Sequence, residues 1–425
     1  MWILKQGERK TWTIAFVDIN TPGEFEETIH KVAGVPMIRM PQTVYQPKET
    51  ATFEVLAAAP TVEVTDSEGK LQKVTVKSKS GHVKEVSCML PSVGLYTVKV
   101  TDGDKQSQGV LSAHASWEWT MERAREGALK YHQKATSHIE SWYGFHSSFI
   151  AARYFPEKQL DEALRSRFDY LFGLLHDRTK MVPLYHASRI QNTSGTIGLL
   201  VDKYEAYGDV EDLKKASRLA DWLMNTWQRK DGAYVNHNTV YTSVIYVAKS
   251  MLELTLVERE LGKTESVWKE AADRHYASAK RAIDQLVASQ GDFETEGELT
   301  FEDGMVSCSA LQIGMLALMQ QDEKERKHYT DAMLQILNSH DCLTQLRGGG
   351  TMRYWEAQYD VQMLPNMFNS PHGWSGWRAY ATYYAYLLTG EERWLKETFN
   401  AMGAFSNLID FRTGDLRWAF VVDRI

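Results

Sequence analysis

The chain has 425 residues, of which 43% are hydrophobic, and a formal net charge of −7. This length exceeds what one small domain needs and predicts two domains, or one large domain with an appendage. With this net negative charge, the surface has no overall positive potential that would attract a polyanion. Nucleic acid and acidic membranes are therefore poor candidates as main partners, and any affinity for an acidic ligand must come from a local part of the surface.

The cysteines and the N-terminal sequence further narrow the class of protein. Cys88, Cys308 and Cys342 have no CxxC spacing, so they indicate packing residues rather than disulfides or a zinc site, and we expect no metal and no cofactor. The N-terminus has no apolar run of signal-peptide length, and no segment reaches the roughly 18 apolar residues of a membrane span. We expect a soluble protein, cytoplasmic or, if a signal peptide was removed, periplasmic or secreted.

Residues 1–112 alternate β-branched and polar residues with the period of a strand. The alternating segments are TWTIAFVDI, ATFEVLA, TVEVTD, LQKVTVKS and GLYTVKVTD. Turn sequences such as SEGK and DGDK separate them. We predict a small antiparallel β-sandwich domain over 1–112. It would shape one wall of a substrate cleft or mediate homo-oligomerisation.

After Trp117 the apolar residues recur at helical spacing, and the second domain, 113–425, is predicted to be all α. Two kinds of helix alternate along it. The charged kind covers 159–176, 210–227, 265–288, 322–338 and 391–405. The kind that is apolar or small-residue-rich on nearly all sides covers 139–154, 193–206, 240–257, 304–319 and 373–388.

A helix that is apolar on all sides is buried, and one with a wide charged face lies outside. Their alternation every 50 to 65 residues or so is typical of helical hairpins arranged in a ring. The links from outer to inner helices are long and rich in aromatic and polar residues, whereas the reverse links, such as AYGDVED and LTGEER, are short turns. We therefore expect the functional site at the N-termini of the inner helices, where the long links emerge.

This pattern resembles the (α/α)6-toroid carbohydrate-active enzymes: the six-hairpin glycosidases and related polysaccharide lyases, which often carry an N-terminal β-sandwich. The resemblance covers roughly 117–420, and its motifs are DGAYVNH, FEDGMVSCSAL and SPHGWSGW. It is closest to the uronic-acid-acting members, such as β-glucuronidases and unsaturated glucuronyl hydrolases. The resemblance implies an oligosaccharide or polysaccharide substrate.

Glycoside hydrolysis usually needs two carboxyl groups across one sugar bond. Asp303 is the first candidate, because FEDG runs there into a buried apolar helix. The alternative role for Asp303 is an N-cap, which would also hold it ionised and suit a base. Further acids of the same links are Asp231, Asp292, Glu294, Glu296 and Glu302.

Glu356 is the second catalytic candidate, with Asp360 in reserve. Tyr354 and Trp355 flank Glu356 and could desolvate its carboxyl group, which raises the pKa toward that of a general acid. The alternative is an ion pair with Arg353 or Arg347.

Aromatic faces stack on sugar rings, and cations bind a uronate carboxylate. The predicted end of the ring is rich in both. The aromatic candidates are Trp142, Tyr143, Tyr234, Trp355, Trp374 and Trp377. The cationic candidates are His146, His186, Arg189, His237, Arg353, His372 and Arg378. Each lone aromatic is more often a core residue, and each lone histidine more often a structural one.

Two other functions stay open. In a polysaccharide lyase, Asn369 would neutralise the uronate carboxylate while His372, with a nearby tyrosine, removes the C5 proton. Ser370 and Pro371 of the same segment also read as an ordinary helix start. The third hypothesis is a non-catalytic scaffold or a sugar isomerase, since fold alone does not decide chemistry. The hypothesis placed first is a glycoside hydrolase that removes a uronic acid.

Overall fold

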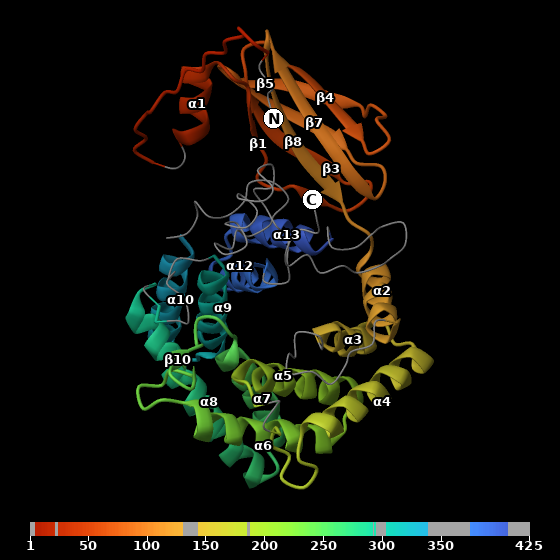
Figure 1. Ribbon diagram of the computed structural model, residues 1–425, viewed down its shortest axis with the longest axis vertical. Helices are drawn as coiled ribbons and strands as arrows, with labels where there is room; N and C mark the ends of the chain where they lie inside the picture. The colour runs from red at the N-terminus through yellow and green to blue at the C-terminus, as the bar shows by residue number, and fades with distance from the viewer. Residues whose placement is uncertain are drawn as a thin grey trace. The chain divides into compact units, whose positions relative to one another are not determined.

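The computed structural model of the chain describes residues 5–21, 24–130, 143–184, 188–291, 293–294, 303–338 and 375–406. Contacts divide the chain into two compact units. Unit 1 comprises Met1–Met40, Thr50–Leu90 and Leu95–Leu111, and unit 2 comprises Pro41–Glu49, Pro91–Gly94 and Ser112–Ile425. The strand-rich part and the helical part each follow the fold class that the sequence predicts (Figure 1).

The strands form two four-stranded sheets, in the orders β1-β3-β6-β5 and β2-β8-β7-β4. Alternate residues along the strands are buried, as in Ala51, Phe53 and Val55 of β3, which is the two-residue period of a half-buried strand. The strands are β1 (Met37–Arg39), β2 (Val44–Tyr45), β3 (Thr50–Leu56), β4 (Thr61–Asp66), β5 (Val74–Ser80), β6 (Val83–Met89), β7 (Gly94–Asp102) and β8 (Lys105–Ala113).

Two details of this domain differ from the prediction. TWTIAFVDI, residues 11–19, forms no strand, and its apolar side chains, such as Phe16, are exposed. Alternation supplies β propensity, but a strand also needs a partner, and none pairs with this segment among the described residues. The sandwich is also not wholly antiparallel, because β2 pairs with β8 in parallel. A short helix, α1 (Phe25–Ala33), precedes the sheets.

Unit 2 consists of paired helices. Its inner helices contact one another in the order α3, α5, α7, α9 and α12, and each is followed by a charged helix (Figure 1). The described inner helices are α3 (Tyr143–Tyr154), α5 (Ile190–Tyr207), α7 (Val247–Leu261), α9 (Asp303–Met319) and α12 (Ser375–Thr389). The others in this unit are α2 (Trp117–Lys130), α4 (Lys158–Leu175), α6 (Val210–Trp227), α8 (Ser266–Ser289), α10 (Glu323–Asn338) and α13 (Glu392–Ser406).

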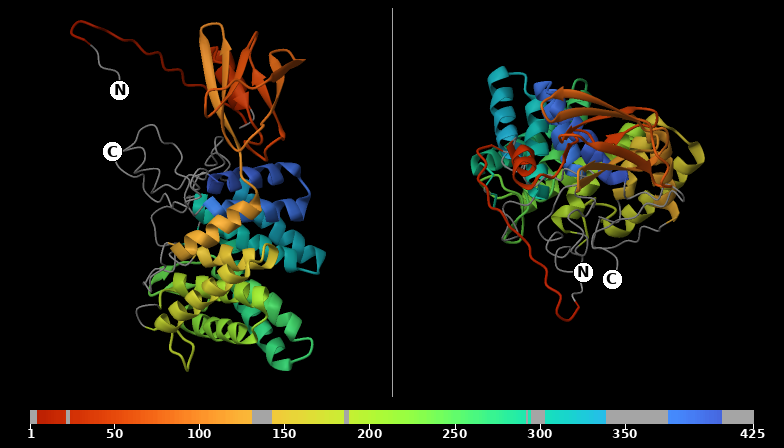
Figure 2. Two further views of the ribbon diagram at one scale, coloured as in Figure 1. Left: turned by 90° about the vertical axis from the view of Figure 1, so that its right-hand side faces the viewer. Right: turned by 90° about the horizontal axis from the view of Figure 1, so that it is seen from above.

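These bounds lie within a few residues of the predicted inner and outer segments, except that α7 starts at Val247 rather than at residue 240, and the helices of the unit run side by side (Figure 2). The large core of unit 2 lies between the two sets of helices and includes Phe149, Phe168 and Leu199. The short turns are as expected: Gly208 ends α5 in the left-handed conformation, and Asp209 then caps α6 by accepting a bond from the Glu211 N–H. None of the helices in the described part of the chain has the length and hydropathy of a membrane span.

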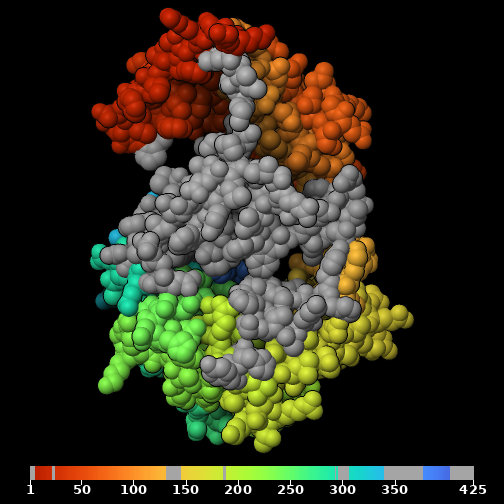
Figure 3. All heavy atoms as spheres, in the orientation of Figure 1, coloured from red at the N-terminus to blue at the C-terminus, as the bar shows by residue number. Residues whose placement is uncertain are grey.

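The yellow to green surface of unit 2 in the space-filling view comes from helices α4 to α8 and their links (Figure 3). One of these links, 228–246, holds the small hairpin of β9 (Val235–Asn236) and β10 (Thr239–Val240). Gly232 anchors this link closely to α8, since a Cβ atom there would lie 2.4 Å from the carbonyl oxygen of Arg281. The backbone of the link therefore approaches α8 too closely at this position for a residue with a Cβ atom.

Candidate functional site

Tyr234 of the link 228–246 lies in the core rather than on a surface. Its side chain is fully buried, and its hydroxyl group is 2.8 Å from the Ser278 hydroxyl. Burial raises the pKa of Tyr234, so the phenol stays protonated. Because its ring has no exposed face, Tyr234 cannot stack on a sugar here, and the prediction that it binds substrate is not supported.

Two other predicted residues of the long links keep part of their surface exposed. His237 occupies the turn between β9 and β10 with a φ of 56° and is exposed, and its ring meets that of Trp227 edge to face with ring centres 5.4 Å apart. Arg189 is half-buried at the N-terminus of α5, where the sequence placed it. Their role in substrate binding stays a prediction.

Asp231 and Glu294, two acids considered for catalysis, are both paired with Arg229. The Arg229 guanidinium lies 2.6 Å from Asp231 and 2.8 Å from Glu294. Hydrogen bonds from Arg229 lower the pKa of both carboxyl groups. These acids are exposed and ionised, so they are poor candidates for a general acid.

Asp303 is the first residue of α9, which agrees with the predicted helix start, although its side chain lies outside the described part. Asp303 therefore remains a candidate both as a cap and as a catalytic acid. Several predicted residues lie outside the described residues altogether. They are Trp142, His186, Asp292, Glu296, Glu302, Arg347, Arg353, Tyr354, Trp355, Glu356, Asp360, Asn369, His372 and Trp374.

Ionisable side chains meet on the ring side of the inner helices, the side turned away from the outer helices, and of these only His146 was predicted from the sequence. Asp202 of α5 lies 2.6 Å from Nδ1 of His146 in α3, and Glu205, one turn further along α5, pairs with Arg153 of α3. Lys249 and Glu253 pair within α7. We call these six residues, together with Tyr380 and Tyr384 of α12, the interior cluster.

The carboxyl groups of the interior cluster differ in their electrostatic surroundings. Burial raises the pKa of Glu205, the nearby carboxylates of Asp202 and Glu253 raise it further, and Arg153 opposes them. A carboxyl group whose pKa is raised by burial and by like charge is suited to hold a proton and donate it. Its side chain is 34% exposed, so a ligand can reach it.

Tyrosines of α12 complete the cluster. The Tyr380 and Tyr384 rings meet edge to face with centres 6.2 Å apart, and the Lys249 ammonium lies 4.9 Å from the centre of the Tyr380 ring. Burial raises the pKa of Tyr384 to about 12, although Lys249 works in the opposite direction. At neutral pH both phenol groups are therefore protonated, and they are better suited to donate hydrogen bonds than to act as bases.

The signal that could have found this cluster is charge inside helices predicted to be buried. DKYE in α5 and KSMLE in α7 place three acids and two lysines within inner helices. Charge in an inner helix does not by itself identify a functional site, because Arg378 of α12 is also a cation of an inner helix. It is buried and pairs with Glu397 of α13 at 2.8 Å, which is a structural contact between paired helices.

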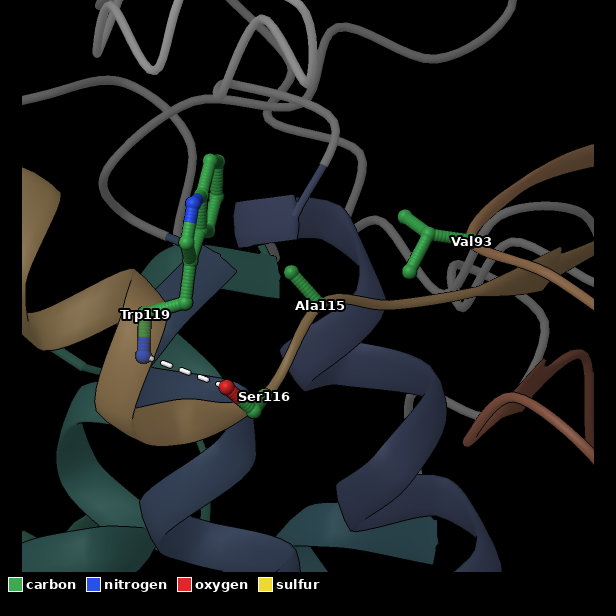
Figure 4. Close-up of a pocket in the computed structure, with 4 residues that line it drawn as sticks. All are labelled: Val93, Ala115, Ser116 and Trp119. Carbon is green, nitrogen blue, oxygen red and sulfur yellow. Dashed lines mark hydrogen bonds between the residues drawn. The ribbon is translucent and has the colours of Figure 1, made fainter.

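A separate hollow of about 330 Å³ lies where α2 begins (Figure 4). Val93, Ala115, Ser116 and Trp119 line it, and the Trp119 N–H of the backbone donates to the Ser116 hydroxyl at 3.2 Å. These lining residues offer an apolar wall and one hydroxyl group but no titratable side chain, so they cannot supply acid–base chemistry. No group of three potential metal ligands occurs among the described residues.

No family model matches the sequence, and no curated protein matches it. Among solved structures, a polysaccharide lyase matches 95% of this chain with a TM-score of 0.72 and 13% sequence identity. This chain has an (α/α)-toroid fold. It spans 62% of the length of that lyase. The predicted resemblance to toroid carbohydrate-active enzymes is thus confirmed at the level of the fold.

Other solved structures match less closely. A family 76 glycoside hydrolase from a bovine Bacteroides thetaiotaomicron strain has a TM-score of 0.43 at 12% identity, and the match covers 92% of this chain and 94% of that one. An unsaturated glucuronyl hydrolase from Streptococcus agalactiae has a TM-score of 0.42 at 12% identity, covering 72% of this chain and 85% of that one.

Proposed function

We propose that this protein is a carbohydrate-active enzyme that cleaves a glycan containing uronic acid or a similar acidic sugar. The observation that carries the proposal is the interior cluster, in which carboxylates, cations and tyrosines from four inner helices meet on the ring side. Cations suit the sugar carboxylate, aromatic faces suit the sugar ring, and carboxyl groups suit proton transfer to a glycosidic oxygen.

Hydrolysis is the first mechanism. It needs one carboxyl group as an acid and a second as a base or nucleophile. Asp303 and Glu356 remain the proposed pair from the sequence. Glu205 is an additional candidate for the acid, because its raised pKa favours the protonated form at neutral pH more than that of an ordinary glutamate.

Elimination is the second mechanism, and a specific contact favours it. Asp202 accepts a hydrogen bond from Nδ1 of His146 and so fixes the orientation of the imidazole, as a histidine that serves as a base toward an acidic C–H requires. A base of this kind, beside cations that neutralise the uronate, is what removal of the C5 proton requires. The likeness to a polysaccharide lyase supports this alternative at the level of fold.

The deciding experiment incubates the protein with a panel of uronic-acid-containing glycans. It follows reducing-sugar release and ultraviolet absorbance together, because elimination leaves an absorbing 4,5-double bond and hydrolysis of a saturated substrate does not. Release without absorbance supports hydrolysis, and release with absorbance supports elimination. If neither signal appears with any acidic glycan while a neutral glycan is cleaved, the proposed substrate class is wrong.

A further inference from the structure

Lys249, in the first turn of α7, is surrounded by aromatic rings. Its ammonium nitrogen lies 4.9 Å from the centre of the Tyr380 ring and 6.0 Å from that of Tyr246. Tyr246 in turn meets Trp377 edge-on, with ring centres 6.0 Å apart, and Tyr380 meets Tyr384. A single cation therefore lies among four aromatic side chains from two parts of the chain.

These side chains meet on the ring side of the inner helices. Helices α7 and α12 both contact α9, which lies between them in the order of inner helices, while α8 and α10 contact α9 from the outer set. A contact between Lys249 of α7 and Tyr380 of α12 must therefore pass α9 on its ring side. The carboxylates of Glu253 and Asp202, which also influence Tyr380, come from two further positions on the same side.

One face of α12 remains exposed although the helix belongs to the inner set. Tyr380, Tyr383 and Leu387 are 44%, 42% and 48% exposed, and their spacing of three and four residues places them in one stripe. The opposite residues, Ala381 and Ala385, are fully buried. An inner helix that exposes a stripe of tyrosines offers flat apolar faces of the type on which sugar rings stack.

Lys249 supplies charge at this stripe. Burial works against its charged form, but the Glu253 carboxylate outweighs that effect and the pKa of Lys249 is raised, so the side chain stays an ammonium ion. An ammonium group has three N–H donors, and its ion pair with Glu253 needs only one. Lys249 can therefore hold a second carboxylate while it keeps Glu253.

We infer that Lys249, Tyr246, Trp377, Tyr380 and Tyr384 form a subsite for a carboxylate-bearing sugar unit, with Lys249 binding the carboxylate and the rings contacting the sugar faces. This inference rests on the proposed function and deepens it. It names the group that recognises the acid, and it assigns the recognition to α7 and α12 rather than to the long links. The subsite would bind a galacturonic or glucuronic unit in preference to its neutral counterpart.

The test measures binding of the galacturonic acid trimer and of the matched galactose trimer by calorimetry, using the full chain. Where the trimer is cleaved, KM replaces Kd. For Lys249→Gln we expect the Kd of the acidic trimer to rise about tenfold or more, as for loss of a charged hydrogen bond, with the neutral trimer unchanged. Lys249→Arg should restore most of the affinity, since it keeps the charge.

Lys327→Gln is the matched control. Lys327 makes the same type of ion pair, with Asp331 four residues on, but on the outer helix α10 and with 75% of its side chain exposed. It should bind both trimers like the original chain. Equal melting temperatures for all variants would show that Lys249→Gln is folded.

Three results would overturn the inference: an unchanged affinity in Lys249→Gln, an equal loss for the acidic and neutral trimers, or no restoration by Lys249→Arg. Its failure is separable from that of the proposed function. If uronate glycans are cleaved but Lys249→Gln behaves like the original chain, the subsite is wrong and the function stands. If no acidic glycan is bound or cleaved, the function is wrong and the subsite with it.

Discussion

The inner helices carry ion pairs on two sides, and these two sides differ in access to solvent. On the side that faces the outer helices, Lys203 of α5 and Asp212 of α6 pair at 2.8 Å and expose only 2% and 1% of their side chains. On the ring side, Lys249 and Glu253 expose 12% and 29%. The chemical groups are of the same kind, but only the ring-side groups can meet a ligand.

This difference separates structural charge from functional charge. A buried pair is costly to break, because removing one partner leaves the other as a charged group with neither a partner nor water around it. A partly exposed pair is worth less to stability, since water screens it, and its groups remain available for exchange with a ligand. We therefore expect substitutions on the two sides to have opposite signatures: loss of stability on one side, and loss of binding or catalysis on the other.

Lys203→Met should show the largest effect. It leaves Asp212 buried with only Lys215 as a partner, and it also removes the bond to Asp169. We expect the free energy of unfolding in urea to fall by about 3 kcal/mol. The affinity of the folded variant for an acidic trimer should not change. A variant of normal stability would mean that the buried pair contributes little, and the division between the two sides would fail.

Glu205→Gln tests the ring side. If Glu205 donates the proton in hydrolysis, kcat on a uronate glycan should fall about 100-fold, the order found when a general acid is lost. The variant should also lose the decline in rate that the original chain shows when Glu205 ionises on the alkaline side. Glu211→Gln, an exposed glutamate of α6 paired with Lys214, is the control. Full activity of Glu205→Gln would remove it from the proposed mechanism.

The sequence predicted the helical ring well but the site only in part. Hydrophobic period and short turns such as that at Gly208 are local signals, so helices α4 to α10 lie within a few residues of their predicted bounds, except α7, which starts later. The meeting of His146 with Asp202 depends on how two inner helices are staggered, and no local pattern reports that. Tyr234 failed for the same reason: a loop-like sequence motif does not reveal that its ring points into the core.

A buried histidine on the outward side gives a pH test of the comparison. His275 of α8 has no exposed surface and lies 2.8 Å from Glu258 and 3.3 Å from Asp221, and Asp221 also pairs with Arg274. Burial works against a charged ring, but the hydrogen bonds to Asp221 and Glu258 prevail and raise the pKa of His275 above 6.5.

The sign of the effect follows from proton linkage. Because the folded chain binds this proton more tightly than the unfolded chain, the stabilisation is present below about pH 6.5 and is lost as the pH rises through the raised pKa. Asp221 acts in the opposite window: burial works against its charged form, but hydrogen bonds from His275 and Arg274 lower its pKa, so its contribution is lost only at acid pH. Urea unfolding across neutral to alkaline pH should show the decline, and His275→Gln should lack it. A decline that persists in His275→Gln would assign the proton to another group.

Lys327→Gln should have the smallest effect, and this makes it the reference for the whole comparison. Lys327 and Asp331 have the same spacing as Lys249 and Glu253, but their side chains are 75% and 59% exposed. An exposed pair of this spacing contributes about 0.3 to 0.5 kcal/mol, so urea unfolding should detect little change. If Lys327→Gln destabilised the chain as much as Lys203→Met, solvent access would not be what distinguishes these ion pairs. The reading of the ring side as the accessible, ligand-binding side would then lose its physical basis.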